Sequence, residues 1–100
     1  SAVLELGLLR LDTSARTVSI RGERMVVTSK EFAILEYFMH NPGRVLSREQ
    51  VEEHVWNYDF NSQSNLVEVY VGRLRRKLEA AGLPDALVTE RGYGYRLETP

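Results

Sequence analysis

SNLVEVYVGRLRRKLEAA, residues 64–81, is the stretch that decides the fold. Taken at about 100° per residue, it places Val67, Val71, Leu74 and Leu78 on one stripe, at spacings of four, three and four. This spacing is typical of a helix with one buried face. We therefore predict a long helix over residues 64–81 that packs against the core.

Cations crowd the C-terminal half of this predicted helix. Arg73, Arg75, Arg76 and Lys77 stand there, with no acid between residues 71 and 77. Such a run is usually only a solvated surface. It can also bind a polyanion, because the field at the contact matters more than the net charge, which is −1 for the whole chain. The sequence on either side of the helix decides between the two readings.

Length and composition predict one domain, residues 1–100. The chain has no cysteine, which excludes disulfides and thiolate zinc sites and fits a reducing compartment such as the cytoplasm. No apolar run approaches the length of a membrane span. Because the chain starts at Ser1 and not at a methionine, we expect a further domain upstream.

The first 27 residues predict a small antiparallel sheet of three or four strands. Short runs of β-branched and aliphatic residues alternate with turn signals at residues 7, 12–14 and 21–23. The expected strands are Val3–Leu6 and residues 8–12, 17–21 and 24–27. Nothing in them indicates chemistry, so we expect this sheet to act as a scaffold.

A first capping box predicts a helix from Thr28 to about His40. The Thr28 hydroxyl can accept the amide of Glu31, and the Glu31 carboxylate can accept the amide of Thr28. The apolar face of this helix is expected to be Phe32, Leu35, Phe38 and Met39, with Ile34 at its edge.

A second capping box, Ser47 with Gln50, predicts a helix that runs to about Trp56. Val51 and Val55 are expected to face inward, and residues 44–46 can pair briefly as a strand. The polar loop after it contains Ser62 and Ser64, either of which can cap the long helix.

Residues 87–97 predict a β-hairpin, because two alternating runs flank a glycine-containing tip that carries Arg91. Two helices joined by a loop, the second basic, then a hairpin: this is the order of a winged helix-turn-helix, an α+β fold. In that fold the long helix can enter a major groove of DNA, and the hairpin tip can reach an adjacent minor groove.

From Leu11 onward the chain resembles the effector domain of OmpR/PhoB-type response regulators. The matching pieces are VTSKEFAILEY (27–37), NPGRVLSREQV (41–51), HVW (54–56), SNLVEVYVGRLRRKL (64–78) and RGYGYRL (91–97). The resemblance implies a four-stranded antiparallel N-terminal sheet, three helices and a C-terminal hairpin wing. It also implies transcription control at bacterial promoters by dimers on repeated half-sites, with an upstream receiver domain that a sensor kinase phosphorylates.

The resemblance also implies roles for individual residues. Arg73 matches the base-reading arginine of the family, and Arg91 matches the arginine that enters the minor groove. Further positions that face the bases correspond to Asn65, Leu66, Val69 and Tyr70. Phosphate contacts correspond to Trp56, Arg75, Arg76, Thr89 and Tyr95. The loop that contacts RNA polymerase corresponds to Asn57, Tyr58, Asp59, Phe60 and Asn61.

Four of these positions allow a second interpretation from their chemistry. Trp56 can equally anchor the end of its helix in the core, and Tyr95 can equally pack against the long helix. The rings of Tyr58 and Phe60 can cover the edge of the core. The chain also departs from the family where relatives often carry arginine, at Asn65 and Gly72.

Glu90 is a third departure, because it stands where a small apolar residue is common, and a carboxylate repels phosphates.

One alternative is the winged-helix module of a transcription regulator without a receiver domain. The alternative to DNA binding is a module on the same scaffold that uses the basic helix to bind protein or RNA. An enzyme is not predicted, because the sequence offers no nucleophile with a neighbouring base and no paired catalytic carboxylates. Neither a cofactor nor a metal is predicted. Glu53 and His54 diverge on their helix, and no second histidine is near.

Overall fold

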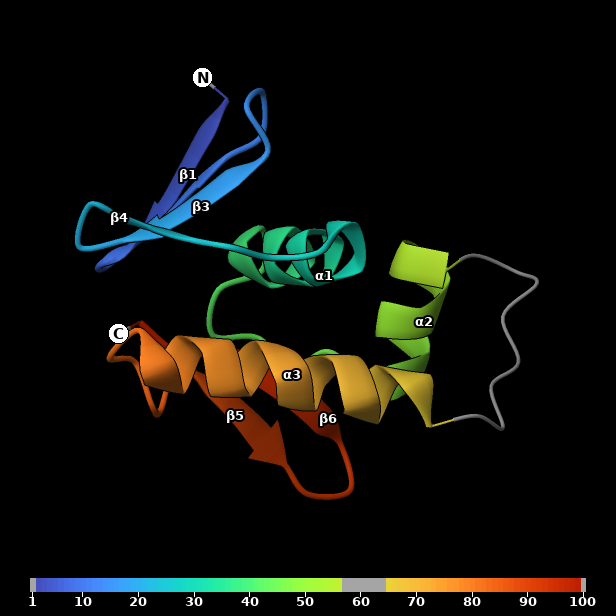
Figure 1. Cartoon of the computed structure of the whole chain (residues 1–100). Coiled ribbons are helices and arrows are strands. Elements are labelled where there is room, and N and C mark those ends of the chain that lie inside the picture. Colours follow the sequence, from blue (N-terminus) through green and yellow to red (C-terminus); the bar gives the residue numbers. More distant parts are fainter. Residues whose placement is uncertain (1, 57–64, 100) are drawn as a thin grey trace.

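The computed structural model describes residues 2–56 and 65–99. Its elements are β1 (Val3–Leu6), β2 (Leu9–Asp12), β3 (Thr17–Ile20), β4 (Glu23–Met25), α1 (Ser29–Met39), α2 (Arg48–Trp56), α3 (Leu66–Ala80), β5 (Leu87–Glu90) and β6 (Gly94–Leu97). Figure 1 shows α1 between the N-terminal sheet and α3, with α2 near the start of α3 and the hairpin emerging from behind α3, its tip below that helix. None of the helices in the described part of the chain has both the length and the apolar character of a membrane span.

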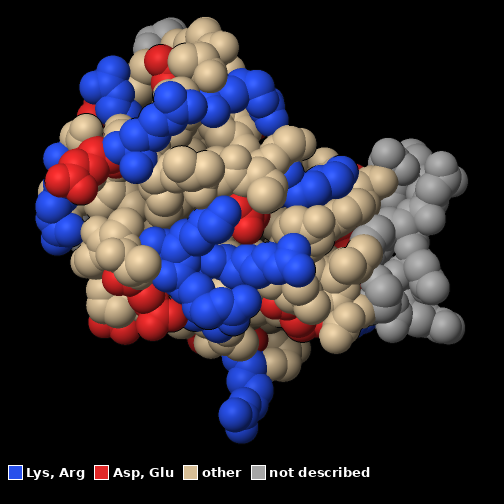
Figure 2. Space-filling view, in the orientation of Figure 1, with Lys and Arg blue, Asp and Glu red and all other residues tan. Residues whose placement is uncertain are grey.

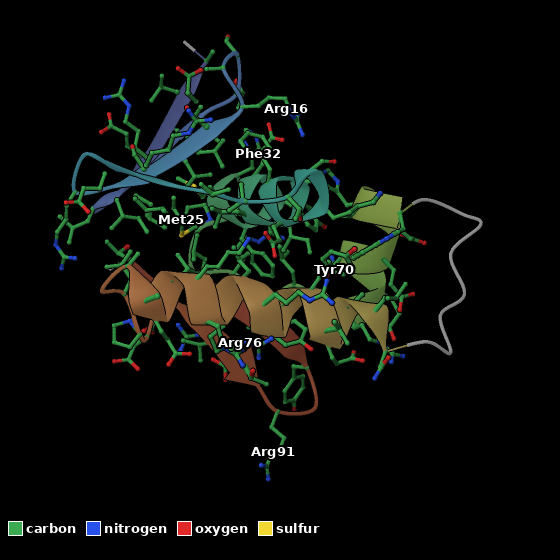
Figure 3. The ribbon with its side chains drawn as sticks, viewed as in Figure 1. Arg16, Met25, Phe32, Tyr70, Arg76 and Arg91 are labelled. Carbon is green, nitrogen blue, oxygen red and sulfur yellow. The ribbon has the colours of Figure 1, made fainter. Side chains whose placement is uncertain are left out.

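The N-terminal strands form one antiparallel sheet in the order β1-β2-β3-β4. Leu9 pairs with Ile20 and Leu11 with Val18, and all four side chains are buried. The alternation in β2 and β3 therefore directs one face of the sheet into the core. This confirms the predicted antiparallel sheet, with four strands. Figure 3 shows Arg16, from the turn after β2, close to Phe32 of α1.

Helix α1 is buried on more than one side. Phe32, Leu35 and Phe38 are at most 2% exposed, as the pattern predicts. Ile34, predicted at the edge of the apolar face, is also fully buried. The reason is that α1 contacts β1, β6, α2 and α3, so that no lateral edge of its apolar stripe reaches solvent.

Both predicted capping boxes form. The Thr28 amide donates to Glu31 Oε1 at 2.8 Å, and the Glu31 amide donates to Thr28 Oγ1 at 3.2 Å. At α2 the Ser47 amide donates to Gln50 Oε1 at 2.8 Å, and the Gln50 amide donates to Ser47 Oγ at 3.1 Å. Each exchange satisfies backbone donors that the first turn of a helix leaves unpaired.

Helix α3 buries the stripe that the sequence predicts, since Val67, Val71, Leu74 and Leu78 are at most 1% exposed. The described helix begins at Leu66 and not at residue 64, and Asn65 is its N-cap without a side-chain capping bond. Ser62 and Ser64, the predicted caps, lie outside the described residues.

The hairpin β5-β6 has the predicted range, and of residues 44–46, expected to pair briefly as a strand, Leu46 forms an isolated bridge to Tyr95. Leu46 donates to Tyr95 O at 2.8 Å, and Tyr95 donates back to Leu46 O at 3.0 Å. This pairing explains Gly94, which has a φ of +142° and lies so close to Leu46 that a Cβ would sit 2.1 Å from the Leu46 carbonyl oxygen. The hairpin is thus joined by backbone hydrogen bonds to the segment that leads into α2.

Glu31 has a second role that its capping box does not predict. Its side chain is only 1% exposed, and Lys77 Nζ of α3 lies 2.5 Å from Glu31 Oε1. Burial pushes the pKa of Glu31 upward, but the bonds from Lys77 and from the Thr28 amide outweigh burial and hold this pKa below its ordinary value of 4.5. A charged Glu31 therefore stabilises the contact between α1 and α3.

We predict that Glu31→Gln lowers the free energy of unfolding by about 2 kcal/mol at neutral pH, since a charge-assisted bond is lost while the half-buried Lys77 can regain water. The pKa of Glu31 is lowered by folding. Its stabilisation is therefore complete above pH 4.5 and is lost as the pH falls through the lower folded value. Denaturant unfolding from pH 7 to pH 3 measures both effects.

The matched control is Glu36→Gln on the same helix, where the partly exposed Glu36 side chain lies 3.8 Å from the exposed His40 ring. We expect it to change stability by less than about 0.5 kcal/mol. If the difference in the free energy of unfolding between wild type and Glu31→Gln stays constant down to pH 3, the ionised form of Glu31 is not what stabilises the contact.

Candidate nucleic-acid interface

The solvent face of α3 and its N-cap carry four of the five residues that the resemblance assigns to base contacts. Leu66 is 38% exposed, Val69 is half-buried and Arg73 is exposed. Successive members are three and four residues apart, so the three side chains form one ridge along the helix. Asn65 is exposed at the N-cap beside this ridge. Figure 2 shows lysine and arginine side chains gathered over α3 in this view.

The four cations that crowd the C-terminal half of α3 do not all remain free. Lys77 is paired with the buried Glu31, and Arg75 is bonded to the hairpin. Arg73 and Arg76 are exposed, and neither pairs with a carboxylate in the described part of the chain. Half of the local charge is therefore used within the fold, because Arg75 and Lys77 point sideways toward β5 and α1.

Arg75 connects α3 to β5. Its Nε donates to Leu87 O at 3.0 Å, and its second guanidinium nitrogen donates to Thr89 Oγ1 at 2.6 Å. The planar guanidinium fixes both bonds in one orientation. The sequence predicts Arg75 and Thr89 as two separate phosphate contacts, whereas the structure joins them to each other and gives Arg75 a role in holding the wing.

Tyr95 lies directly opposite Thr89 in the hairpin and packs against the core with its ring half-buried. Burial raises the pKa of its hydroxyl, and Glu68 adds to the rise while Arg75 and Arg48 oppose it. The hydroxyl therefore stays protonated at neutral pH and keeps its hydrogen-bond donor. The Tyr95 ring therefore packs against the core, as one of its two interpretations predicts. Its hydroxyl can still donate a hydrogen bond to a phosphate.

Arg48, at the start of α2, is a residue whose position sequence reasoning missed. It lies within 3.4–3.8 Å of carboxylate oxygens of Glu49, Glu52 and Glu68. Glu52 is 5% exposed, and its Oε1 accepts no hydrogen bond from the described residues. The spacing of Arg48 and Glu52, one helical turn, was the available signal. The contact to Glu52 lies within α2, whereas the contact to Glu68 links α2 to α3.

Trp56 and Tyr70 meet between the end of α2 and the first half of α3. Their ring centroids are 5.4 Å apart at an interplanar angle of 65°, and both side chains are half-buried against the core. Figure 3 shows Tyr70 on the side of α3 that faces the other helices. Trp56 thus packs against the core, as one of its two interpretations predicts. Tyr70 does not lie on the exposed ridge of Leu66, Val69 and Arg73.

The wing tip presents Arg91 to solvent, and Figure 3 shows this side chain projecting away from the rest of the molecule. Glu90 and Thr89 are neighbours on β5, so their side chains point to opposite faces of the hairpin. Glu90 Oε2 pairs with Arg96 Nε at 2.5 Å. The repulsion expected from Glu90 is therefore reduced, because its charge is paired and lies on the face away from Thr89 and Tyr95.

The predicted polymerase-contact loop, residues 57–61, lies outside the described residues. Among residues 2–56 and 65–99, no group of three histidine, aspartate or glutamate side chains is suited to hold a metal ion.

Comparison with known proteins identifies the family. The family described as "Transcriptional regulatory protein, C terminal" matches residues 22–97, which include all three helices and the hairpin. This chain belongs to that family. Membership confirms the predicted class, the winged-helix effector domain of an OmpR/PhoB-type response regulator, which regulates transcription and is not an enzyme.

The relatives agree with this assignment. The response regulator MprA of Mycobacterium ulcerans (strain Agy99) is 46% identical over 101 residues, covering 100% of this chain and 44% of MprA. The AdeR DNA-binding domain, solved in complex with an intercistronic region, has a TM-score of 0.86 and 30% identity, covering 96% of this chain and 99% of that one. DrrB of Thermotoga maritima, an OmpR/PhoB homologue, has a TM-score of 0.82 and 28% identity, covering 98% of this chain and 45% of DrrB. This chain spans about half the length of the curated relatives that it matches.

We predict that Arg75→Ala lowers the free energy of unfolding by about 1–2 kcal/mol, because two charge-assisted bonds to β5 are lost. It should also speed amide hydrogen exchange in β5 and β6 more than in the N-terminal sheet. Denaturant unfolding and native-state hydrogen exchange measure the two effects.

The neighbouring Arg76→Ala is the control, since Arg76 is exposed and has no carboxylate partner in the described residues. It should leave stability within about 0.5 kcal/mol of wild type. Equal effects of the two substitutions would contradict a structural role for Arg75.

Proposed function

We propose that the chain binds double-stranded promoter DNA sequence-specifically, with α3 in the major groove and the β5-β6 hairpin at an adjacent minor groove. The observation that carries the proposal is Arg73. It is exposed, lies on the helix that the core fixes, and has no carboxylate partner in the described part of the chain. The AdeR DNA-binding domain, solved in complex with an intercistronic region, supports DNA as the ligand of this fold.

Base reading falls to the ridge on α3. The guanidinium of Arg73 can donate in a fork to O6 and N7 of guanine, and the apolar Leu66 and Val69 can contact thymine methyl groups. Asn65, exposed at the N-cap, can bond to a base edge or to a phosphate. The buried stripe on the opposite face of α3 holds these side chains in a fixed orientation relative to the core.

Phosphate contacts fall to side chains that flank the ridge. Arg76 is the free cation of the group. Thr89, Tyr95 and Trp56 can each donate through a hydroxyl or an indole N–H. Arg75 is bonded to Thr89 of the wing, so we assign it mainly to holding the wing in place and not to direct contact with a DNA phosphate. Arg91, at the tip, is assigned to the minor groove.

The remainder of the full-length protein is also a proposal. Relatives are about twice as long as this chain, which leaves room for an upstream receiver domain phosphorylated by a sensor kinase. We further propose a cytoplasmic protein whose effector domain is a monomer when free and pairs with a second copy on repeated half-sites. Residues 57–61 are assigned to contact with RNA polymerase, as in the family that the sequence resembles.

We predict that Arg73→Ala folds normally but loses about 1–3 kcal/mol of binding free energy on the preferred site, with relaxed discrimination at one base position. The preferred site is obtained by selection from random duplexes. Binding to that site and to all its single-base variants then measures the discrimination.

Arg76→Ala is the matched comparison. Loss of one phosphate contact should weaken binding to all these sequences alike and reduce the slope of log K against log salt by about 0.9. If Arg73→Ala also lowers affinity uniformly, with every base preference intact, Arg73 is a phosphate contact and not a base reader.

For the wing, we predict that Arg91→Ala leaves the unfolding free energy unchanged within about 0.5 kcal/mol, since the side chain is solvated in the free protein. It should weaken binding most when the flanking sequence is A·T-rich, because a narrow minor groove concentrates negative potential. Titrations with A·T and G·C flanks test this, and equal losses on both would reduce Arg91 to a non-specific contact.

A further inference from the structure

Four side chains from three helices form a continuous series of cation and ring contacts beside the ridge of α3. The Lys30 ammonium lies 5.4 Å from the ring centroid of Trp56. The Trp56 ring meets that of Tyr70 edge to face at 5.4 Å. The guanidinium carbon of Arg73 lies 5.3 Å from the Tyr70 centroid. All three separations are within the range of favourable cation–π or aromatic contacts.

The far end of this series is anchored to the fold. Lys30 Nζ donates to Val55 O at 3.1 Å, which ties the start of α1 to the last turn of α2. Trp56 and Tyr70 are half-buried and pack against the core. The Tyr70 ring therefore has a neighbour that restricts its rotation, and its position is set by α1 and α2 as well as by α3.

Arg73 is the solvent-exposed end of the same series. It is exposed, and the Tyr70 ring is its contact among the described residues, with no carboxylate competing for the guanidinium. Tyr70 precedes it by three residues on α3, so the ring lies on the adjoining surface of the helix. An arginine side chain loses considerable rotamer freedom when it is fixed by a ligand. A ring that restricts the guanidinium beforehand reduces that loss.

We infer that Tyr70 is a positioning residue for Arg73, and that it acts on base discrimination through the arginine without contacting a base itself. The inference rests on the proposed function, in which Arg73 reads a base. It differs from the base contact that the resemblance implied for Tyr70, because the half-buried ring is occupied by Trp56 on one side and by the guanidinium of Arg73 on the other. The hydroxyl group is not required for this role, whereas the aromatic face is.

The test uses Tyr70→Phe, which keeps the ring, and two variants that remove it, Tyr70→Leu and Tyr70→Met. Met is flexible enough to refill the gap beside Trp56 if Leu impairs folding. Thermal unfolding selects the ring-free variant with the smaller loss of stability. Each protein is titrated with the selected site and with its single-base variants.

Tyr70→Phe should retain discrimination at the base position that Arg73 controls. The ring-free variant should lose about two- to fivefold of discrimination at that position, the range that an exposed cation–π contact supports. In an Arg73→Ala background, removing the ring should have no further effect on discrimination, which a double-mutant cycle measures. Uniform loss on all sites, or equal effects of Phe and the ring-free variant, overturns the inference.

A second measurement needs no DNA and separates this inference from the proposed function. In the free protein, the Nε–H resonance of Arg73 should shift when the ring is removed and should remain near its wild-type position in Tyr70→Phe. An unchanged resonance in the ring-free variant overturns the positioning role even if Arg73 reads a base. A shifted resonance, with no base preference lost in Arg73→Ala, upholds the contact and instead overturns the proposed base reading.

Discussion

The rest of the structure depends on the buried carboxylate of Glu31. One oxygen accepts the Thr28 amide, which starts α1, and also receives Lys77 from the last turns of α3. A carboxylate that is 1% exposed is costly to bury unless such partners are present. The two bonds fix the start of the central helix against the C-terminal half of α3, and the apolar stripe of α3 then closes on the same core. The orientation of the ridge follows from this pairing.

A second constraint fixes the wing. Arg75 donates to Leu87 O and to Thr89, while Leu46 and Tyr95 exchange backbone hydrogen bonds. The hairpin is thus held from α3 on one side and from the approach to α2 on the other. This matters for a protein that must place Arg73 and Arg91 in neighbouring grooves, because an error in the angle between helix and wing would prevent simultaneous contact. Two-stranded hairpins are only marginally stable without such support.

The charges of this chain are divided between folding and recognition. Lys77 and Arg75 serve the fold, Arg96 pairs with Glu90, and Arg48 joins α2 to α3 through Glu68. The cations left for a polyanion on α3 are Arg73 and Arg76. A net charge of −1 is therefore compatible with DNA binding, since the cations that remain free lie together on one surface. Specific contacts, more than bulk attraction, then have to provide the affinity.

The sequence by itself determined the elements and their order. Local rules suffice for these features, because each depends on neighbours within a few residues. They are the 3.6-residue period of α3, the Thr28 and Ser47 capping boxes and the glycine-rich hairpin tip. The family motifs extended this to the class of function and to the candidate positions of the site. Only the tertiary structure decided which of these side chains are free. Glu31 and Lys77 are 46 residues apart, Arg75 and Thr89 are 14 apart, and Tyr70 is set against Trp56 of another helix. No periodicity in the sequence predicts such pairings, since they arise when the core brings separate elements together.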